Sequence, residues 1–151
     1  MYIVIVGGGK VGFYLAKELV EANHEVLVIE RNASKCAEIQ EALGEIVMRG
    51  DGCEAAIQER AGVNRADLIL AVTGEDEDNL VACQVAKHLF GVPRSLCRIY
   101  DPIREQMYHK LGLRTISPTK VGARLVKEAL EAPGGEPVGT HDGGRAEGTA
   151  S

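Results

Sequence analysis

The segment GGGKVG at residues 7–12 constrains the fold more than any other part of this sequence. It follows a continuous apolar run at residues 2–6, typical of a strand covered on both faces, and leads into a helical apolar period over residues 10–22. A strand, a turn with the spacing Gly-x-Gly-x-x-Gly and a helix make up the first unit of a dinucleotide-binding fold. This order of elements predicts a parallel sheet with helices packed against it.

The same alternation of strand and helix continues along the chain. Strands are expected at residues 2–6, 25–30, 46–48, 67–72, 96–100 and 114–116, and helices at residues 10–22, 34–43, 54–61, 75–90, 102–111 and 118–130. Strands that alternate with helices form right-handed βαβ units. The prediction is therefore an α/β fold with a Rossmann-like, doubly wound sheet of six parallel strands, followed by a last helix that Ser117 caps.

A change of composition predicts where the folded domain ends. Residues 132–151 contain six glycines and two prolines and lack Leu, Ile, Phe, Tyr and Met. Such a segment cannot bury enough apolar surface to offset the entropy lost on ordering, so a disordered tail is expected there. Residues 1–131 are expected to form one domain.

Charge and apolar runs exclude several classes of function. The formal charge is −5, from 17 Lys and Arg against 22 Asp and Glu, and no basic block reverses it locally, so nucleic acid is not an expected partner. No apolar run reaches the roughly 18 to 20 residues that span a bilayer, and no signal peptide is recognisable. We expect a cytoplasmic protein without direct membrane insertion, whose four cysteines are free thiols, Cys83 and Cys97 among them in the core.

The three fingerprint glycines have separate expected roles. Gly7 permits the tight turn, Gly9 lets the backbone approach a pyrophosphate, and Gly12 lets the helix pack closely on the strand. The N-terminus of the helix offers free N–H groups and the positive end of its dipole to phosphates.

Glu30 ends the second expected strand, 18 residues after Gly12, near the position of a ribose-binding carboxylate. Its negative charge would repel the 2′-phosphate of NADP, which disfavours that ligand, while the positive charge of the neighbouring Arg31 acts in the opposite direction. A carboxylate on a ribose does not distinguish NAD(H) from ATP, ADP or AMP. Lys10 suits a terminal phosphate, and a solvated lysine in the first helical turn is the equal alternative.

No catalytic constellation is recognisable. None of the four tyrosines has a lysine four residues later, which is the pair used by short-chain dehydrogenases, and the histidines lie in separate segments. The acidic run at residues 75–78 is interpreted as compensation of a helix dipole, with a cation site as the alternative. The prediction is a binding protein and not an enzyme, with a small NAD-dependent oxidoreductase, or the nucleotide-binding half of one, as the rival.

The ordered part of the chain resembles a known family. The segments VGGGKVGFYLAKEL, VLVIE, RGDG, DLILAVTGEDEDN, RIYDP and LGLRTISPTKVGARLV are together similar to the RCK domain, the regulator of potassium conductance that is also called KTN or the TrkA N-terminal domain. The last two segments strengthen the likeness most, because a plain Rossmann fold does not require them.

The resemblance implies a set of nucleotide-binding residues. They are Gly7, Gly9, Lys10, Val11 and Gly12 at the phosphates, Glu30 and Arg31 at the ribose, Gly50, Asp51 and Gly52 at the adenine, and Thr73, Gly74, Asn79 and Arg98 along the rest of the site. The family often has Ala-Thr after Gly-Asp where this sequence has Gly52-Cys53, and the family's C-terminal effector lobe has no counterpart here.

The resemblance also implies partners. It predicts a nucleotide-sensing regulatory subunit of a membrane potassium transporter or channel, bound at the inner face of the membrane through that partner. The last helix carries an apolar stripe, formed by Val121, Leu125, Val126, Ala129 and Leu130. In the family this helix crosses onto a second domain, which predicts a homodimer or a higher ring. The alternative is that the stripe packs on its own domain. For the function, a third possibility is a binding module of an organic-anion or proton–cation antiporter.

Overall fold

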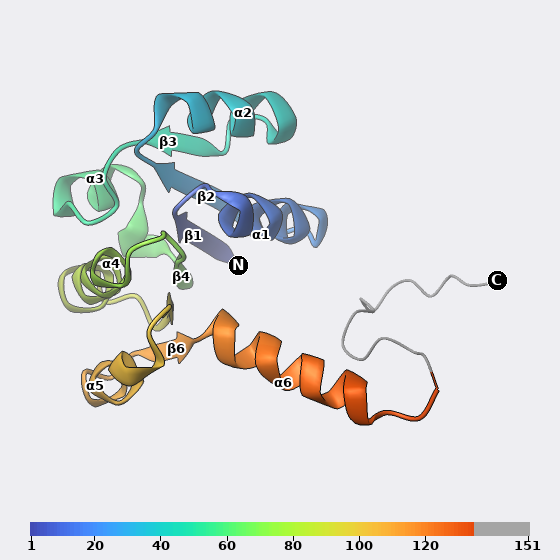
Figure 1. The fold of residues 1–151 in the computed structure, drawn as a ribbon. Coiled ribbons are helices and arrows are strands. Elements are labelled where there is room, and N and C mark those ends of the chain that lie inside the picture. Colours follow the sequence, from blue (N-terminus) through green and yellow to red (C-terminus); the bar gives the residue numbers. More distant parts are fainter. Residues whose placement is uncertain (135–151) are drawn as a thin grey trace. The chain divides into compact units, whose positions relative to one another are not determined.

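A single sheet organises the first 116 residues of the computed structural model, which describes residues 1–134 (Figure 1). Its strands are β1 (Tyr2–Val6), β2 (Glu25–Glu30), β3 (Val47–Arg49), β4 (Leu68–Ala71), β5 (Arg94–Arg98) and β6 (Arg114–Ile116). All neighbouring strands are parallel, in the order β3-β2-β1-β4-β5-β6. This is the strand order of a Rossmann-like, doubly wound sheet, so the predicted fold class is confirmed.

Helices cover both faces of this sheet. They are α1 (Lys10–Glu21), α2 (Ala33–Leu43), α3 (Ala55–Arg60), α4 (Asp76–Phe90) and α5 (Glu105–Lys110), with short 3₁₀ turns η1 (Val63–Arg65) and η2 (Pro102–Arg104). Figure 1 shows α1 and α2 along one side of the sheet and α3, α4 and α5 along the other. Two layers of helices therefore enclose the strands, as the continuous apolar runs of β1 and β4 require.

The side chains of β1 alternate between two hydrophobic cores. Ile3 and Ile5 pack on the α1–α2 face with Ala16 of α1 and Ile39 of α2. The alternate residues of β1 pack on the opposite face, where the helices contribute a second set of core residues. From β1 these are Tyr2, Val4 and Val6, and from the helices Ala82, Cys83, Ala86 and Tyr108. Cys83 and Cys97 are fully buried free thiols, as predicted. Burial of both faces is expected of a central strand of a parallel sheet that helices cover on both sides.

The centre of the sheet is a topological switch point. β1 and β4 are neighbours, with Val6 opposite Ala71, yet the chain leaves β1 toward α1 on one face and β4 toward α4 on the other. The connections therefore diverge at the carboxyl ends of these two strands. A crevice at this place is where ligands bind in open α/β sheets.

Two boundaries differ from the sequence prediction in an informative way. β5 was expected at residues 96–100 and runs over Arg94–Arg98, because the backbone N–H groups of Tyr100 and Asp101 donate to the Asp76 carboxylate at 2.7 and 3.1 Å. The helix expected at residues 102–111 divides into η2 and α5. Asp101 caps η2 by accepting from the N–H of Ile103 at 3.1 Å.

A second compact unit begins at Ser117 and contains α6 (Pro118–Glu131). Ser117 caps the helix by accepting from the N–H of Lys120, and Pro118 occupies its first position, as the sequence predicts. The expectation of a disordered tail falls, beyond residue 134, outside the described residues, and the extent of the domain over residues 1–131 stays a prediction. Within residues 1–134 no helix combines the length and the apolar character needed to cross a membrane.

Candidate nucleotide site at the switch point

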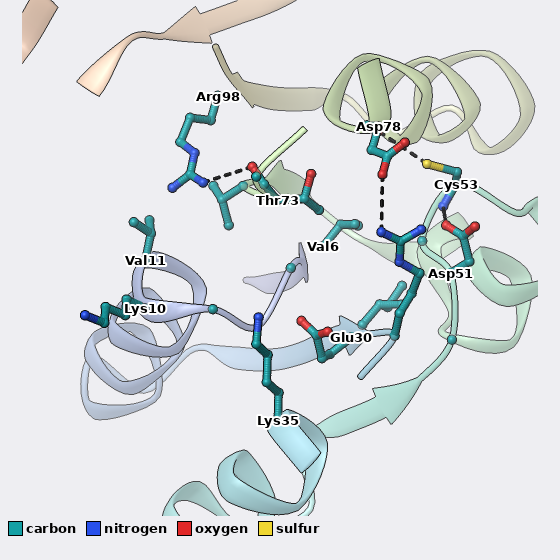
Figure 2. Close-up of a pocket in the computed structure, with 18 of the residues that line it drawn as sticks. Val6, Lys10, Val11, Glu30, Lys35, Asp51, Cys53, Thr73, Asp78 and Arg98 are labelled. Carbon is teal, nitrogen blue, oxygen red and sulfur yellow. Dashed lines mark hydrogen bonds and ion pairs between the residues drawn. The ribbon is translucent and has the colours of Figure 1, made fainter. Parts of the chain in front are cut away.

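A hollow of about 360 Å³ opens at the carboxyl ends of the strands (Figure 2). Its lining comes from the carboxyl ends of β1, β2 and β5, from the loops that follow the strands, and from the first turns of α1, α2 and α4, all within the first compact unit. All the site residues predicted from the sequence line it except Gly12 and Asn79. The structure therefore brings together residues that are as far apart in sequence as Gly7 and Arg98, and their roles toward a ligand remain to be tested.

The glycine-rich loop is shaped by two of its glycines. Gly7 has φ +109°, a conformation that favours glycine, and a Cβ there would lie 3.0 Å from the backbone nitrogen of Thr73. A Cβ on Gly12 would overlap the carbonyl oxygen of Gly7, so α1 can approach β1 this closely only with glycine at that position. Gly12 accordingly supports the loop from behind.

The glycine-rich loop has open space beside Gly9. A Cβ at Gly9 would meet no atom within 4 Å, and the residue is the N-cap of α1 without a capping side chain. The first N–H groups of a helix have no partner within the helix. The start of α1 therefore presents unpaired N–H groups and the positive end of its dipole at an empty part of the hollow, which is an arrangement suited to phosphate.

Glu30 anchors the loop to the end of β2. Its two carboxylate oxygens accept from the N–H of Gly8 at 2.6 Å and from the N–H of Asn32 at 2.8 Å. Each oxygen of a carboxylate has acceptor capacity for a further donor, so these bonds leave room for ribose hydroxyls. Gly8 was not singled out in the sequence, yet a Cβ there would lie 2.6 Å from Cδ1 of Ile39 and 3.2 Å from the Glu30 carboxylate.

The side of the hollow that follows β3 carries Asp51. One oxygen of its carboxylate, Oδ1, accepts from the N–H of Cys53 at 2.9 Å. Gly52 has no room for a side chain, because its Cβ would overlap Cγ1 of Val6. Burial, together with the charges of Asp51 and Asp78, raises the pKa of the Cys53 thiol to about 12. This thiol is protonated at neutral pH and is a poor nucleophile.

The opposite side of the hollow carries a buried cation. Arg98 is only 7% exposed, and its Nη2 donates to the Thr73 carbonyl at 2.9 Å and to the Tyr100 hydroxyl. Its guanidinium lies 4.5 Å from the centre of the Tyr100 ring, while its Nε has no hydrogen-bond partner. In the part of the chain that the structure describes, no carboxylate forms an ion pair with it. A buried positive charge without a counterion favours an anionic ligand.

Asn79 lies directly behind the lining of the hollow. It is fully buried and does not line the hollow itself, so its expected place near the ligand stays a prediction. Its amide accepts from the N–H and the hydroxyl of Thr73, at 2.8 and 2.7 Å, and donates to the carbonyls of Thr73 and Arg98. With both ends of the amide engaged, Asn79 ties β4 to β5 and fixes the position of Thr73.

Three acids at the start of α4 are engaged within the fold, and Asp76 and Glu77 share Arg104 as a partner. Asp76 holds the backbone of Tyr100 and Asp101, Glu77 pairs with Arg104 at 2.9 Å, and Asp78 pairs with Arg31 at 3.6 Å. Within residues 1–134 no group of three or more His, Cys, Asp or Glu side chains is arranged to hold a metal ion. These acids therefore secure loops around the hollow, in addition to their favourable position at a helix N-terminus.

Three polar residues of the lining were not predicted: Lys35, Asp78 and Tyr100. Asp78 and Tyr100 stand within DLILAVTGEDEDN and RIYDP, two of the segments that carry the family resemblance, but no local pattern distinguishes them from their neighbours. Lys35 carries a local signal that was overlooked, since it places a positive charge in the first turn of α2.

The fold and the hollow define a class, the Rossmann-like domains with a glycine-rich loop at the switch point of the sheet. Residues 3–118 match the model of the TrkA-N domain, and the chain belongs to that family. This confirms the family expected from the sequence.

Two relatives are Trk system potassium uptake proteins. The TrkA homolog of Methanothermobacter thermautotrophicus is 34% identical over 134 residues, which are 88% of this chain and 62% of the relative. TrkA of Streptomyces coelicolor is 34% identical over 138 residues, which are 91% of this chain and 62% of the relative. The chain thus spans about three fifths of the length of these proteins.

Solved structures share the fold. The TrkA-N domain of the inner membrane protein ybaL from Escherichia coli superposes with a TM-score of 0.79 at 19% identity, covering 86% of this chain and 96% of that domain. The GsuK channel bound to NAD has a TM-score of 0.73 at 22% identity, with 82% and 22% covered. The Shewanella denitrificans Kef CTD in AMP-bound form has a TM-score of 0.72 at 22% identity, with 86% and 80% covered.

Proposed function

We propose that this chain is a nucleotide-sensing module that binds NAD(H) or an adenine nucleotide at the hollow and regulates a membrane potassium transporter or channel. One observation carries the proposal. A glycine-rich loop, the Glu30 carboxylate and the buried, unpaired cation Arg98 face one hollow at the switch point of the sheet. An anionic nucleotide with a ribose matches these three features in charge and hydrogen bonding.

The comparisons support each part of the proposal in a limited way. Proteins named for potassium uptake share the family, and structures that share the fold are described as bound to NAD or to AMP. These structures are under 25% identical, so they support the fold and make the ligand classes reasonable candidates. AMP is a component of NAD, ADP and ATP, and the site is expected to recognise this common part.

Regulation by such a site requires two arrangements with different affinities for the nucleotide. A ligand shifts an equilibrium only by its difference in affinity for the two states. We propose that the two arrangements are those of paired copies of the chain at the cytoplasmic face of the membrane. The surface that meets the second copy is the apolar stripe of α6, which includes Val121, Leu125 and Leu130.

The rival function is an NAD-dependent oxidoreductase. Its hydride transfer would need a substrate site and a proton donor beside the nucleotide. In the described hollow the Cys53 thiol has a raised pKa and is therefore not an activated nucleophile. Steady formation of NADH from NAD by any metabolite, lost on Glu30→Ala, would establish the rival.

Thermal unfolding with NAD, NADH, ATP, ADP and AMP tests the binding. A ligand present at about 100 times its dissociation constant stabilises the folded protein by roughly 2.7 kcal/mol, which raises Tm by several degrees. GMP serves as the control, because its 6-oxo group cannot donate to Asp51. Unchanged melting temperatures with all five nucleotides would remove the proposal.

A further inference from the structure

The first turn of α2 contains a lysine at a position where the helix dipole favours an acid. Lys35 is the third residue of the helix, and no acidic residue stands in that turn. A cation at a helix N-terminus is unfavourable. α4, whose start also borders the hollow, has Asp76, Glu77 and Asp78 in its first turn. Lys35 therefore lowers the stability of the start of α2.

No internal interaction compensates this charge. In the described part of the chain, the Lys35 ammonium forms no ion pair within 4 Å, and only its backbone N–H is engaged, by Oδ1 of Asn32 at 2.9 Å. Both oxygens of the neighbouring Glu30 carboxylate accept from backbone N–H groups. The fold thus keeps an unpaired cation at this point, and such breaks of a local rule are expected at functional sites.

Lys35 borders the space in which a bound phosphate is expected. It lines the hollow together with Gly9, Lys10 and Glu30, and it also lines a second hollow between the first turns of α1 and α2. Figure 2 shows its side chain rising from α2 toward the glycine-rich loop beside Glu30, whereas Lys10 extends along the outer side of α1. Of the two lysines, Lys35 is directed toward the space between the loop and the ribose-binding carboxylate.

We infer that Lys35 is a phosphate-binding residue of this site, an inference that rests on the proposed nucleotide binding. The ammonium supplies a point charge to a phosphate held at the start of α1, so two helix N-termini and one lysine surround the same anion. The phosphate belongs either to the 5′ chain of the nucleotide or to the ribose. Lys10, which sequence reasoning selected for this role, contributes less.

Titration of the full chain with adenosine, AMP, ADP and adenosine 2′,5′-bisphosphate tests this inference. Lys35→Gln is expected to weaken binding of a phosphorylated ligand about 5- to 10-fold and to leave adenosine within about 2-fold. A loss for AMP and ADP identifies the 5′ chain, and a loss confined to the bisphosphate identifies the ribose phosphate. Lys35→Arg, which keeps the charge, should retain most of the affinity.

Two controls separate this role from a general effect of charge. Lys17→Gln removes the same charge from an exposed position on α1, where Lys17 pairs with Glu21, and should leave all four affinities unchanged. Lys10→Gln should have a smaller effect than Lys35→Gln. Because Lys35 opposes the dipole of α2, Lys35→Gln should also raise the Tm of the ligand-free protein by about 1 to 3 °C, whereas a structural lysine would lower it.

The outcomes distinguish this inference from the proposed function. If wild type and Lys35→Gln bind adenosine, AMP and the bisphosphate with equal affinity, the nucleotide site stands and the role of Lys35 is wrong. If wild type binds none of the four ligands, the proposed function fails and the inference fails with it.

Discussion

Replacing Gly12 with alanine is expected to destabilise the domain by more than about 3 kcal/mol, while the same change at Gly9 leaves it folded. The added Cβ at residue 12 would overlap the carbonyl oxygen of Gly7, a backbone atom that cannot move without displacing the end of β1. At Gly9 the added Cβ meets no atom within 4 Å. Urea unfolding measures both free energies.

The two variants should also differ in their binding. Gly9→Ala fills the space at the start of α1 that we assign to a phosphate, so it should fold and bind the nucleotide at least 10-fold more weakly. This pair separates the packing glycine from the ligand-facing glycine of one motif. Equal stability of the two variants would show that the close approach of α1 to β1 is not required.

Substitution of Arg98 by methionine is expected to weaken nucleotide binding about 10- to 100-fold, because the proposed charged hydrogen bond from its guanidinium to the anionic ligand is lost. Arg98 is buried beside the hollow, stacks on Tyr100 and forms no ion pair among the described residues. Arg98→Lys keeps the charge without the planar fork and should give an intermediate loss. Equilibrium titration of both variants gives the affinities, and their melting temperatures verify that they fold.

Arg65 provides a matched control for Arg98. Its guanidinium also stacks on a tyrosine, 4.0 Å from the centre of the Tyr2 ring, but it pairs with Glu25 at 2.9 Å at the opposite end of the strands. Arg65→Met should therefore leave nucleotide affinity unchanged. Similar losses for Arg65→Met and Arg98→Met would mean that the effect comes from stability or total charge and not from a contact at the hollow.

The architecture followed from local patterns in the sequence. The apolar runs of β1 and β2, the glycines that begin or end helices, and Pro118 after Ser117 each predict an element from a few neighbouring residues, and the sheet and its helices lie where these patterns put them. The boundary of β5 could not be predicted in this way. It depends on the Asp76 carboxylate, more than twenty residues earlier, which captures two N–H groups of the loop after the strand.

The candidate site was predictable where a motif specifies the backbone, as at Gly7 and Glu30. It was less predictable where side-chain contacts decide. Asn79 stands close to the site in sequence and structure, yet hydrogen bonds to Thr73 and Arg98 use both ends of its amide. Lys35 has no place in the motif, and only its exposure at the hollow, together with its unfavourable helix position, identifies it.

The central claim is that the hollow binds the adenine nucleotide part of its ligand and that the Asp51 carboxylate accepts from the adenine amine. Calorimetric titration of AMP and IMP into wild type and Asp51→Asn tests it most directly. The variant keeps the oxygen that accepts from the N–H of Cys53 and replaces the other oxygen by an amide donor. Wild type should bind AMP, whose exocyclic amine donates, about 10-fold more tightly than IMP, and Asp51→Asn should lose or reverse that preference. Absence of saturable AMP binding, or an unchanged preference in the variant, would contradict the account.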